Sequence, residues 1–202
     1  MKKLLGYIKQ SVVDKNSALV LLLGLCPLLM MSSSLLTGLV SGAAAMIVLV
    51  LSGVVISLLG RVIPNGIKDV SYMVITAFFV AICELLLFAF LPSLRTALGI
   101  YLPLITVSGL AFAAAERADN ATVGAAALGG LSLGLGYFAV IFIMSFIREL
   151  FGNGTLFGFR IIPEEYAIRL ITTPFGALFL FGIFVAVFRA VALRAEKGEV
   201  EK

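Results

Sequence analysis

The stretch "NSALVLLLGLCPLLMMSSSLLTGLVSGAAAMIVLVLSGVVISLLG", from Asn16 to Gly60, contains no Asp, Glu, Lys or Arg. A helix needs about 20 apolar residues to cross a bilayer, so this stretch has room for two crossings. Helices satisfy their own backbone hydrogen bonds, which lipid cannot do for them. The stretch therefore predicts an integral membrane protein that begins with two transmembrane helices.

The composition of the whole chain supports the same class. Of its 202 residues, 61% are hydrophobic and 13% are charged, whereas a soluble domain carries about 25% charged residues. The apolar stretches predict six spans, at 18–38, 42–62, 70–91, 97–115, 122–147 and 168–192. The sequence lacks the short alternating segments that are typical of a membrane β-barrel. We therefore expect an all-α integral membrane protein with six transmembrane helices.

The basic residues predict the orientation of these spans. An even number of spans places both termini on one side, with Lys2, Lys3, Lys9, Lys15, Arg61, Lys68, Arg117, Arg189, Arg194, Lys197 and Lys202, and leaves the other side Arg95, Arg148, Arg160 and Arg169. Cytoplasmic loops carry the excess of Lys and Arg, so both termini are predicted to be cytoplasmic. We expect a cytoplasmic lead at 1–17, a membrane domain at 18–192 and a charged cytoplasmic tail at 193–202. The net charge of only +4, placed at helix ends, argues against a nucleic-acid partner.

Two of the spans are predicted to be broken. The first contains Gly24 and a Cys-Pro pair at 26–27, and the fourth carries Pro103 and Gly109 in "YLPLITVSGL". Breaks at matching places in two halves are typical of inverted repeats with a site at the repeat interface. We therefore expect two inverted three-helix repeats, at 18–91 and 97–192.

A short sequence match supports the same division. The tracts "SGAAAM" at 41–46 and "VGAAAL" at 123–128 share "GAAA". Aligned as repeats, the two halves place Cys26 near Ser108 and Gly109. Small residues in these tracts would let helices approach closely. The alternative is a chance match in an alanine-rich chain.

Cys26 and Cys83 are the two thiols of the chain. A buried free cysteine usually behaves as a small hydrophobe. At a helix break, Cys26 could instead ligate a metal or an iron–sulfur cluster, whose potential depends on hydrogen bonds to its sulfurs. Two cysteines cannot supply four thiolates, so a cluster would have to be shared with another subunit. We expect Cys83 to be an inert core thiol, because its spacing from Cys26 fits no local ligand motif.

Glu84 is the acidic residue inside the third span. An ionisable side chain at membrane depth is costly and indicates function by default. It could bind a cation, relay a proton or pair with a neighbouring subunit, and the alternative is a structurally paired carboxylate. The charged groups Glu116, Arg117 and Asp119, and likewise Arg148 with Glu149, are expected to form interface clusters or solvated helix ends.

The long connection from 148 to 169 contains Gly and aromatic residues. It is expected to be an interfacial anchor, or a functional loop. The chain has no His, which excludes His-ligated haem and zinc. It shows no nucleotide-binding glycine motif and no catalytic residues of a hydrolase, so no catalytic residue is predicted within this chain alone.

Four motifs then point to a family. "LGLCPLL", "RVIPNGIKD", "LGIYLPLITV" and "IRELFGNGTLFG" occur in this order over nearly the whole chain. Together they resemble the E subunit of the Rnf complex, which is homologous to the D subunit of the sodium-pumping NADH:quinone reductase. The sister A subunit shares the first and third motifs, and the fourth resembles the E type.

The resemblance implies a role and partners. It implies a membrane subunit of an ion-translocating ferredoxin:NAD oxidoreductase in a prokaryotic plasma (inner) membrane, not catalytic alone, coupled to sodium or proton movement. It implies a 2Fe–2S cluster shared with the sister A-type subunit, further subunits of the B, C, D and G types, and no flavin or haem in this chain. Cys26 falls on the family's first cluster cysteine, and Glu84 on its acidic position in the third span.

The fourth span departs from the family pattern. The family reads Pro-Leu-Ile-x-x-Asn-Cys there, whereas this chain reads "PLITVSG". Ser108 therefore stands at the asparagine and Gly109 at the second cysteine. The cluster could take Ser108 or a partner residue as a further ligand, could use Cys83, or could be absent. The alternatives for function are an inverted-repeat ion transporter or channel with Glu84 as its ion site, and a cofactor-free structural subunit of the same complex.

Overall fold

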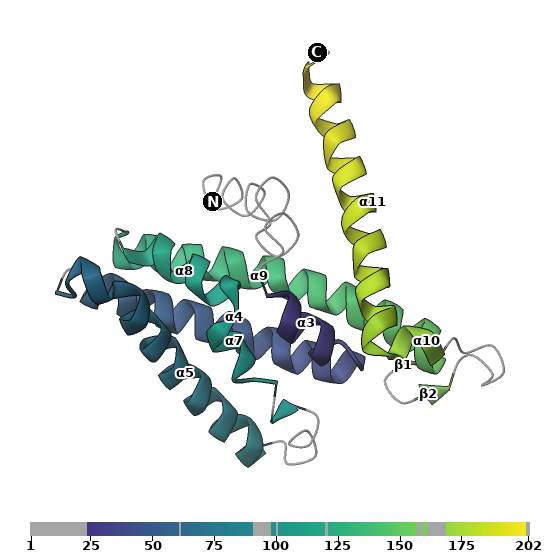
Figure 1. Cartoon of the computed structure of the whole chain (residues 1–202), viewed down its shortest axis with the longest axis horizontal. Coiled ribbons are helices and arrows are strands. Elements are labelled where there is room, and N and C mark those ends of the chain that lie inside the picture. The colour runs from purple at the N-terminus through teal and green to yellow at the C-terminus, as the bar shows by residue number, and fades with distance from the viewer. Residues whose placement is uncertain are drawn as a thin grey trace.

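The chain folds into helices that cross one another around two long antiparallel members (Figure 1). The computed structural model describes residues 24–60, 62–90, 98–99, 101–119, 121–156, 159–160 and 169–200. Its α-helices are α3 (Leu25–Met31), α4 (Leu35–Leu59), α5 (Lys68–Phe90), α7 (Leu104–Val107), α8 (Gly109–Asp119), α9 (Val123–Arg148), α10 (Arg169–Thr172) and α11 (Pro174–Val200). The expected all-α class is confirmed.

Four minor elements complete the described chain. A 3-10 turn, η2 (Asn65–Ile67), precedes α5, and a π-helical turn, η4 (Glu149–Asn153), continues α9. The strands β1 (Thr155–Leu156) and β2 (Phe159–Arg160) pair in an antiparallel hairpin. This hairpin falls within the long connection at 148–169, part of which lies outside the described residues.

Three helices in the described part of the chain are long and apolar enough to cross a membrane. They cover Leu35–Leu59, Lys68–Phe90 and Val123–Asn153. The predicted fourth span is built from α7 and α8, which are separated at Ser108. The sixth corresponds to α11, whose apolar part is Pro174–Val187. Much of the first predicted span lies outside the described residues, so the count of six spans stays a prediction.

The boundary expected between the first two spans, at 38–42, is wrong. α4 continues without interruption from Leu35 to Leu59, and the chain turns earlier, at residues 32–34. Ser34 starts α4 as the N-cap of a capping box, in which Ser34 and Thr37 each bond the other's backbone N–H. Such a box satisfies amides that otherwise lack partners at a helix start. Gly38 and Gly42, which lie at the predicted boundary, face Ser145 and Phe138 of α9.

Glycines bring α4 and α9 into close contact. A Cβ atom added at Gly130 of α9 would lie 2.6 Å from the backbone oxygen of Leu49 in α4. One added at Gly134 would lie 2.7 Å from the Met46 side chain. Membrane helices gain most of their association from such close backbone approach. The two helices therefore form the centre of the bundle, and α5 and α8 pack against them (Figure 1).

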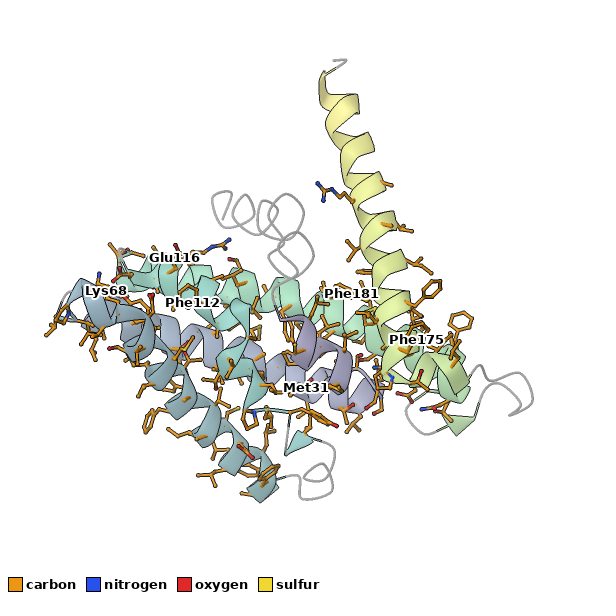
Figure 2. All side chains as sticks on the ribbon, in the orientation of Figure 1. Met31, Lys68, Phe112, Glu116, Phe175 and Phe181 are labelled. Carbon is orange, nitrogen blue, oxygen red and sulfur yellow. The ribbon has the colours of Figure 1, made fainter. Side chains whose placement is uncertain are left out.

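The outer helices show one buried face each. On α5, Tyr72, Thr76 and Val80 are buried at a spacing of four residues, while Val74 and Phe78 are exposed. α11 leaves the bundle towards the C-terminus (Figure 1). Its Phe181 is 3% exposed and packs into the core near the base of that helix (Figure 2). Large exposed apolar side chains on the outer faces are expected where lipid is the solvent.

Candidate functional site at the helix breaks

The first break begins at Gly24, directly before α3. Gly24 adopts φ +85° and ψ 20°, the left-handed conformation that glycine tolerates best. The Leu28 amide then donates the first helical bond, 3.2 Å to the Gly24 oxygen. Pro27 lies in this first turn, where its missing N–H costs no helical hydrogen bond. Pro27 therefore does not interrupt the helix, and Gly24 marks the point where the helix starts with Cys26 in its first turn.

Gly24 also fixes the depth of Cys26. A Cβ at Gly24 would lie 3.4 Å from the Tyr137 ring and 3.5 Å from the Leu110 side chain. Tyr137 stands near the middle of α9, a helix long enough to cross the membrane. The start of α3 is therefore level with the middle of a span.

The second break lies between α7 and α8. Pro103 caps the single turn of α7, and Ser108 then takes an extended conformation with φ −68° and ψ 142°. Gly109 begins α8. The Ser108 hydroxyl donates a 2.6 Å hydrogen bond to the Ile105 oxygen. The predicted interruption of the fourth span is therefore present, and its serine is engaged with its own turn.

A pocket of about 340 Å³ joins the two breaks. Its lining residues are Gly24, Leu25, Cys26, Pro27, Leu104, Val107 and Ser108. Cys26 is exposed and forms no disulfide. Cys26 and Ser108, which are far apart in the sequence, thus face one cavity, as the aligned repeats predicted. The remaining wall is mainly apolar.

The pocket offers one thiol to a metal centre. Cys83 is half-buried on α5 and packs against the central apolar cluster, and it does not line the pocket. No group of three or more His, Cys, Asp or Glu that could hold a metal ion occurs among the residues that the structure describes. Four ligands hold a 2Fe–2S cluster. These residues therefore fit one ligand of a shared cluster and do not fit a cluster held by this chain alone.

Glu84 lies on α5, away from this pocket. It follows Thr76 and Val80 at the same four-residue spacing and is half-buried. It does not line the cavity that contains Cys26. The structure therefore does not bring the predicted ion-coupling residue and the predicted cluster ligand together.

Arg148 and Glu149 are neither a solvated helix end nor exposed interface residues, and that expectation is wrong. Their exposed fractions are 3% and 4%. The guanidinium of Arg148 donates 2.7 Å bonds to the Leu29 oxygen and the Ser32 hydroxyl, and a 3.3 Å bond to the Ile171 oxygen. These partners lie more than 20 residues away in the chain, so no local sequence pattern predicts the contacts.

Glu149 completes this arrangement at the neighbouring helix. Its carboxylate accepts a hydrogen bond from the Leu35 amide at the start of α4. Arg148 and Glu149 thus bind the two sides of the turn at 32–34. Sequence reasoning misses this pair because a charged residue after an apolar span usually marks the water interface.

The opposite end of α4 carries an ion pair from the predicted charged cluster. Lys68 at the start of α5 contacts Asp119 at the end of α8, with 2.8 Å between Nζ and Oδ2. The hydrogen bond from Lys68 holds the pKa of Asp119 below its usual range. Glu116 is exposed at the same end, near Lys68 in Figure 2. Within the predicted charged cluster, Asp119 therefore joins α8 to α5 through its ion pair with Lys68.

The sequence profile of the family described as "Rnf-Nqr subunit, membrane protein" matches residues 4–185. This chain belongs to the Rnf-Nqr family of membrane subunits. The predicted resemblance is thereby confirmed, and with it the assignment to a membrane.

Several Rnf-Nqr proteins resemble this chain over most of its length. An Acetobacterium woodii protein, named as the E subunit of a Na+-translocating ferredoxin:NAD+ oxidoreductase complex, is 35% identical over 180 residues, 88% of this chain and 92% of the relative. A Clostridium ljungdahlii protein, named as the E subunit of a proton-translocating ferredoxin:NAD+ oxidoreductase complex, is 32% identical, covering 100% of this chain and 96% of the relative. A Pseudoalteromonas atlantica protein, named as the E subunit of an ion-translocating oxidoreductase complex, is 38% identical, covering 82% and 72%.

Proposed function

We propose that this chain is the E-type membrane subunit of an Rnf-type complex, which couples electron transfer between ferredoxin and NAD to cation movement across the membrane. The observation that carries the proposal is the pocket at mid-span depth in which both helix breaks meet, with Cys26 on its wall. The family membership and the names of the relatives support the same reading. The name of one relative specifies sodium translocation and that of another specifies proton translocation. We therefore propose only that the transported ion is a monovalent cation.

Within this proposal, Cys26 supplies one thiolate to a 2Fe–2S cluster that the sister A-type subunit shares. The cluster, when bound, provides one-electron transfer at the middle of the membrane. Gly24 allows the turn that starts α3 beside the pocket. The side chains of Leu25, Leu104 and Val107 line the cavity with apolar surface, which excludes water and lowers the local dielectric. The Ser108 hydroxyl is hydrogen-bonded to the Ile105 oxygen, so the further ligands of the cluster come from the partner subunit.

The arrangement of elements supports two inverted repeats at 18–91 and 97–192. In each half, a short helix starts near the pocket (α3 or α8), a short turn follows, and a long span runs next (α4 or α9). α4 and α9 run antiparallel, as their contacts at Leu49 with Gly130 and at Met46 with Gly134 require. Opposite orientation of the two long spans is what an odd number of helices per repeat produces.

We place both termini on the cytoplasmic side of the plasma membrane. Arg148 is buried, so it no longer counts as a loop charge. Without Arg148, the side opposite the termini carries fewer basic residues, so the excess of Lys and Arg on the side of the termini is larger. This excess supports the cytoplasmic orientation derived from the sequence.

For Glu84 we propose a role in cation coupling, because it is a half-buried carboxylate at depth in a span. Glu84→Gln is expected to lower cation uptake by the assembled complex while the amount of complex and its iron content stay unchanged. Uptake of sodium and of protons in proteoliposomes measures this. Unaltered uptake of both cations would remove Glu84 from the ion path.

Purification of the tagged chain from its native membrane tests the function. We expect the chain to emerge with flavin- and iron–sulfur-bearing subunits, and the complex to reduce NAD+ with ferredoxin. An inverted-repeat transporter would emerge alone or as a homo-oligomer without iron. That result would overturn the proposed function.

A further inference from the structure

We propose that Arg148 and Glu149 form a lock that positions the Cys26-bearing helix α3 against the pocket. The importance of this lock for electron transfer rests on the proposed function, but the lock itself is a property of this chain. It consists of Arg148 bound to the end of α3 and Glu149 bound to the start of α4.

Arg148 holds the end of α3 through two short hydrogen bonds. Its Nη1 atom lies 2.7 Å from the Leu29 oxygen and 2.7 Å from the Ser32 hydroxyl. Carbonyl groups at a helix C-terminus lack helical partners and carry partial negative charge, so a guanidinium suits them. Arg148 also reaches the Ile171 oxygen of α10, 3.3 Å from its Nε atom. One buried cation thus ties α3 and α10 to the end of α9.

Glu149 acts on the other side of the same turn. Its carboxylate accepts from the Leu35 amide, the first residue of α4. Unpaired amides at a helix N-terminus carry partial positive charge, so a carboxylate suits them. Each charge therefore meets the helix end of opposite polarity, and this complementarity explains why both charges are tolerated with exposed fractions of 3% and 4%.

The short length of α3 makes this anchoring decisive for Cys26. Seven residues rise about 10 Å and are too few to be stable as a helix on their own. At its start, α3 is placed by the packing of Gly24 against Tyr137 and Leu110. At its end it is held by Arg148. Releasing the end would therefore let α3 tilt and carry the Cys26 thiol away from the α7–α8 break.

Crosslinking between thiols on the two sides of the pocket measures the position of the Cys26 thiol, and the measurement does not require a bound cluster. In full-length chain carrying Cys83→Ala and Ser108→Cys, the thiols at 26 and 108 face one cavity, and dibromobimane reports their proximity. We expect Arg148→Gln to slow the crosslinking about tenfold, equivalent to about 1.4 kcal/mol of lost preference for the held position. Arg148→Lys keeps a cationic donor and should give an intermediate rate.

Lys68→Met is the matched control, because it breaks the half-buried ion pair with Asp119 at the opposite end of α4. This variant should crosslink at the parent rate even if its thermal midpoint falls as far as that of Arg148→Gln. Equal slowing in the two variants would show general loosening and overturn the lock. An unchanged rate in Arg148→Gln would also overturn it.

A second readout, in the purified complex with its native residues at 83 and 108, separates the lock from the proposed function. If the cluster is present, Arg148→Gln should change its EPR line shape or midpoint potential. Arg148→Lys should restore the parent signal in part, and Lys68→Met should leave the signal unchanged. An unperturbed cluster in Arg148→Gln would overturn the role of the lock in positioning the cluster ligand. Slowed crosslinking in the chain that carries Cys83→Ala and Ser108→Cys, together with no cluster signal in the native complex, would uphold the lock and contradict the cluster assignment.

Discussion

Gly24 decides where the Cys26 helix starts. It takes the left-handed backbone conformation beside Tyr137, and a side chain in that conformation costs about 1–2 kcal/mol. The sequence pointed to a break near the Cys-Pro pair, and in the described residues α3 starts directly after Gly24, two residues before Cys26. Pro27 then occupies a first-turn position that suits proline.

Gly24→Ala is expected to lower the free energy of unfolding by about 1 kcal/mol or more. The cause is backbone strain together with a Cβ placed 3.4 Å from the Tyr137 ring. Gly182→Ala in α11 is the control, because a Cβ there meets nothing within 4 Å. Thermal unfolding in one detergent compares the two variants. Equal midpoints would mean that Gly24 does not need its positive φ.

At the scale of elements, the small residues of α4 and α9 determine how closely the two helices approach. Sequence patterns predicted both helices and both breaks, because apolar length and the positions of Gly and Pro are local signals. They placed the boundary between the first two spans at 38–42, inside α4, because no charged residue marks the turn at 32–34. Whether a glycine ends a helix or admits a neighbour depends on a partner helix about 90 residues away, which a local pattern does not contain.

Gly129 and Gly130 provide a matched pair for this packing. Gly130→Ala is expected to destabilise the chain by about 1–3 kcal/mol, as overpacking does, because its Cβ would lie 2.6 Å from the Leu49 oxygen. Gly129→Ala should leave stability unchanged or raise it, since its Cβ meets nothing within 4 Å. Thermal midpoints in detergent report the difference. Equal loss in both variants would contradict the close contact of α4 with α9.

The Lys68–Asp119 pair joins α5 to α8 and predicts a pH dependence. Its hydrogen bond lowers the folded-state pKa of Asp119, so the unfolded state takes up a proton first as the pH falls. The stabilisation is therefore complete above the unfolded pKa of about 4 and disappears as the pH drops through the lower folded value. The stability gap between the parent chain and Asp119→Asn should stay constant from about pH 7 to 5 and close below about pH 4. A gap that persists in full at about pH 2.5 would contradict the pairing.

At the scale of the whole molecule, the chain brings Cys26 and the α7–α8 break to one pocket. Family membership, the membrane assignment and the meeting of Cys26 with the α7–α8 break could all be predicted from motif order and repeat logic. The lock made by Arg148 and Glu149 could not, because its partners lie across the fold and both residues sit where loop charges are expected. The place of Glu84 in the third span was predicted, but that Glu84 does not line the pocket needed the structure. Cys26 is the cysteine that lines the pocket, so the cluster that we propose would take its further ligands from a partner.

The whole-molecule interpretation depends on Cys26 being the ligand through which this chain holds a cluster shared with its sister subunit. EPR of the reduced, purified complex carrying Cys26→Ala examines that role, with Cys83→Ala as the matched control. We expect Cys26→Ala to remove or shift one 2Fe–2S signal and to lower the iron content, and Cys83→Ala to change neither. A complete set of signals in the Cys26→Ala complex would contradict the ligand assignment and favour a cofactor-free structural subunit.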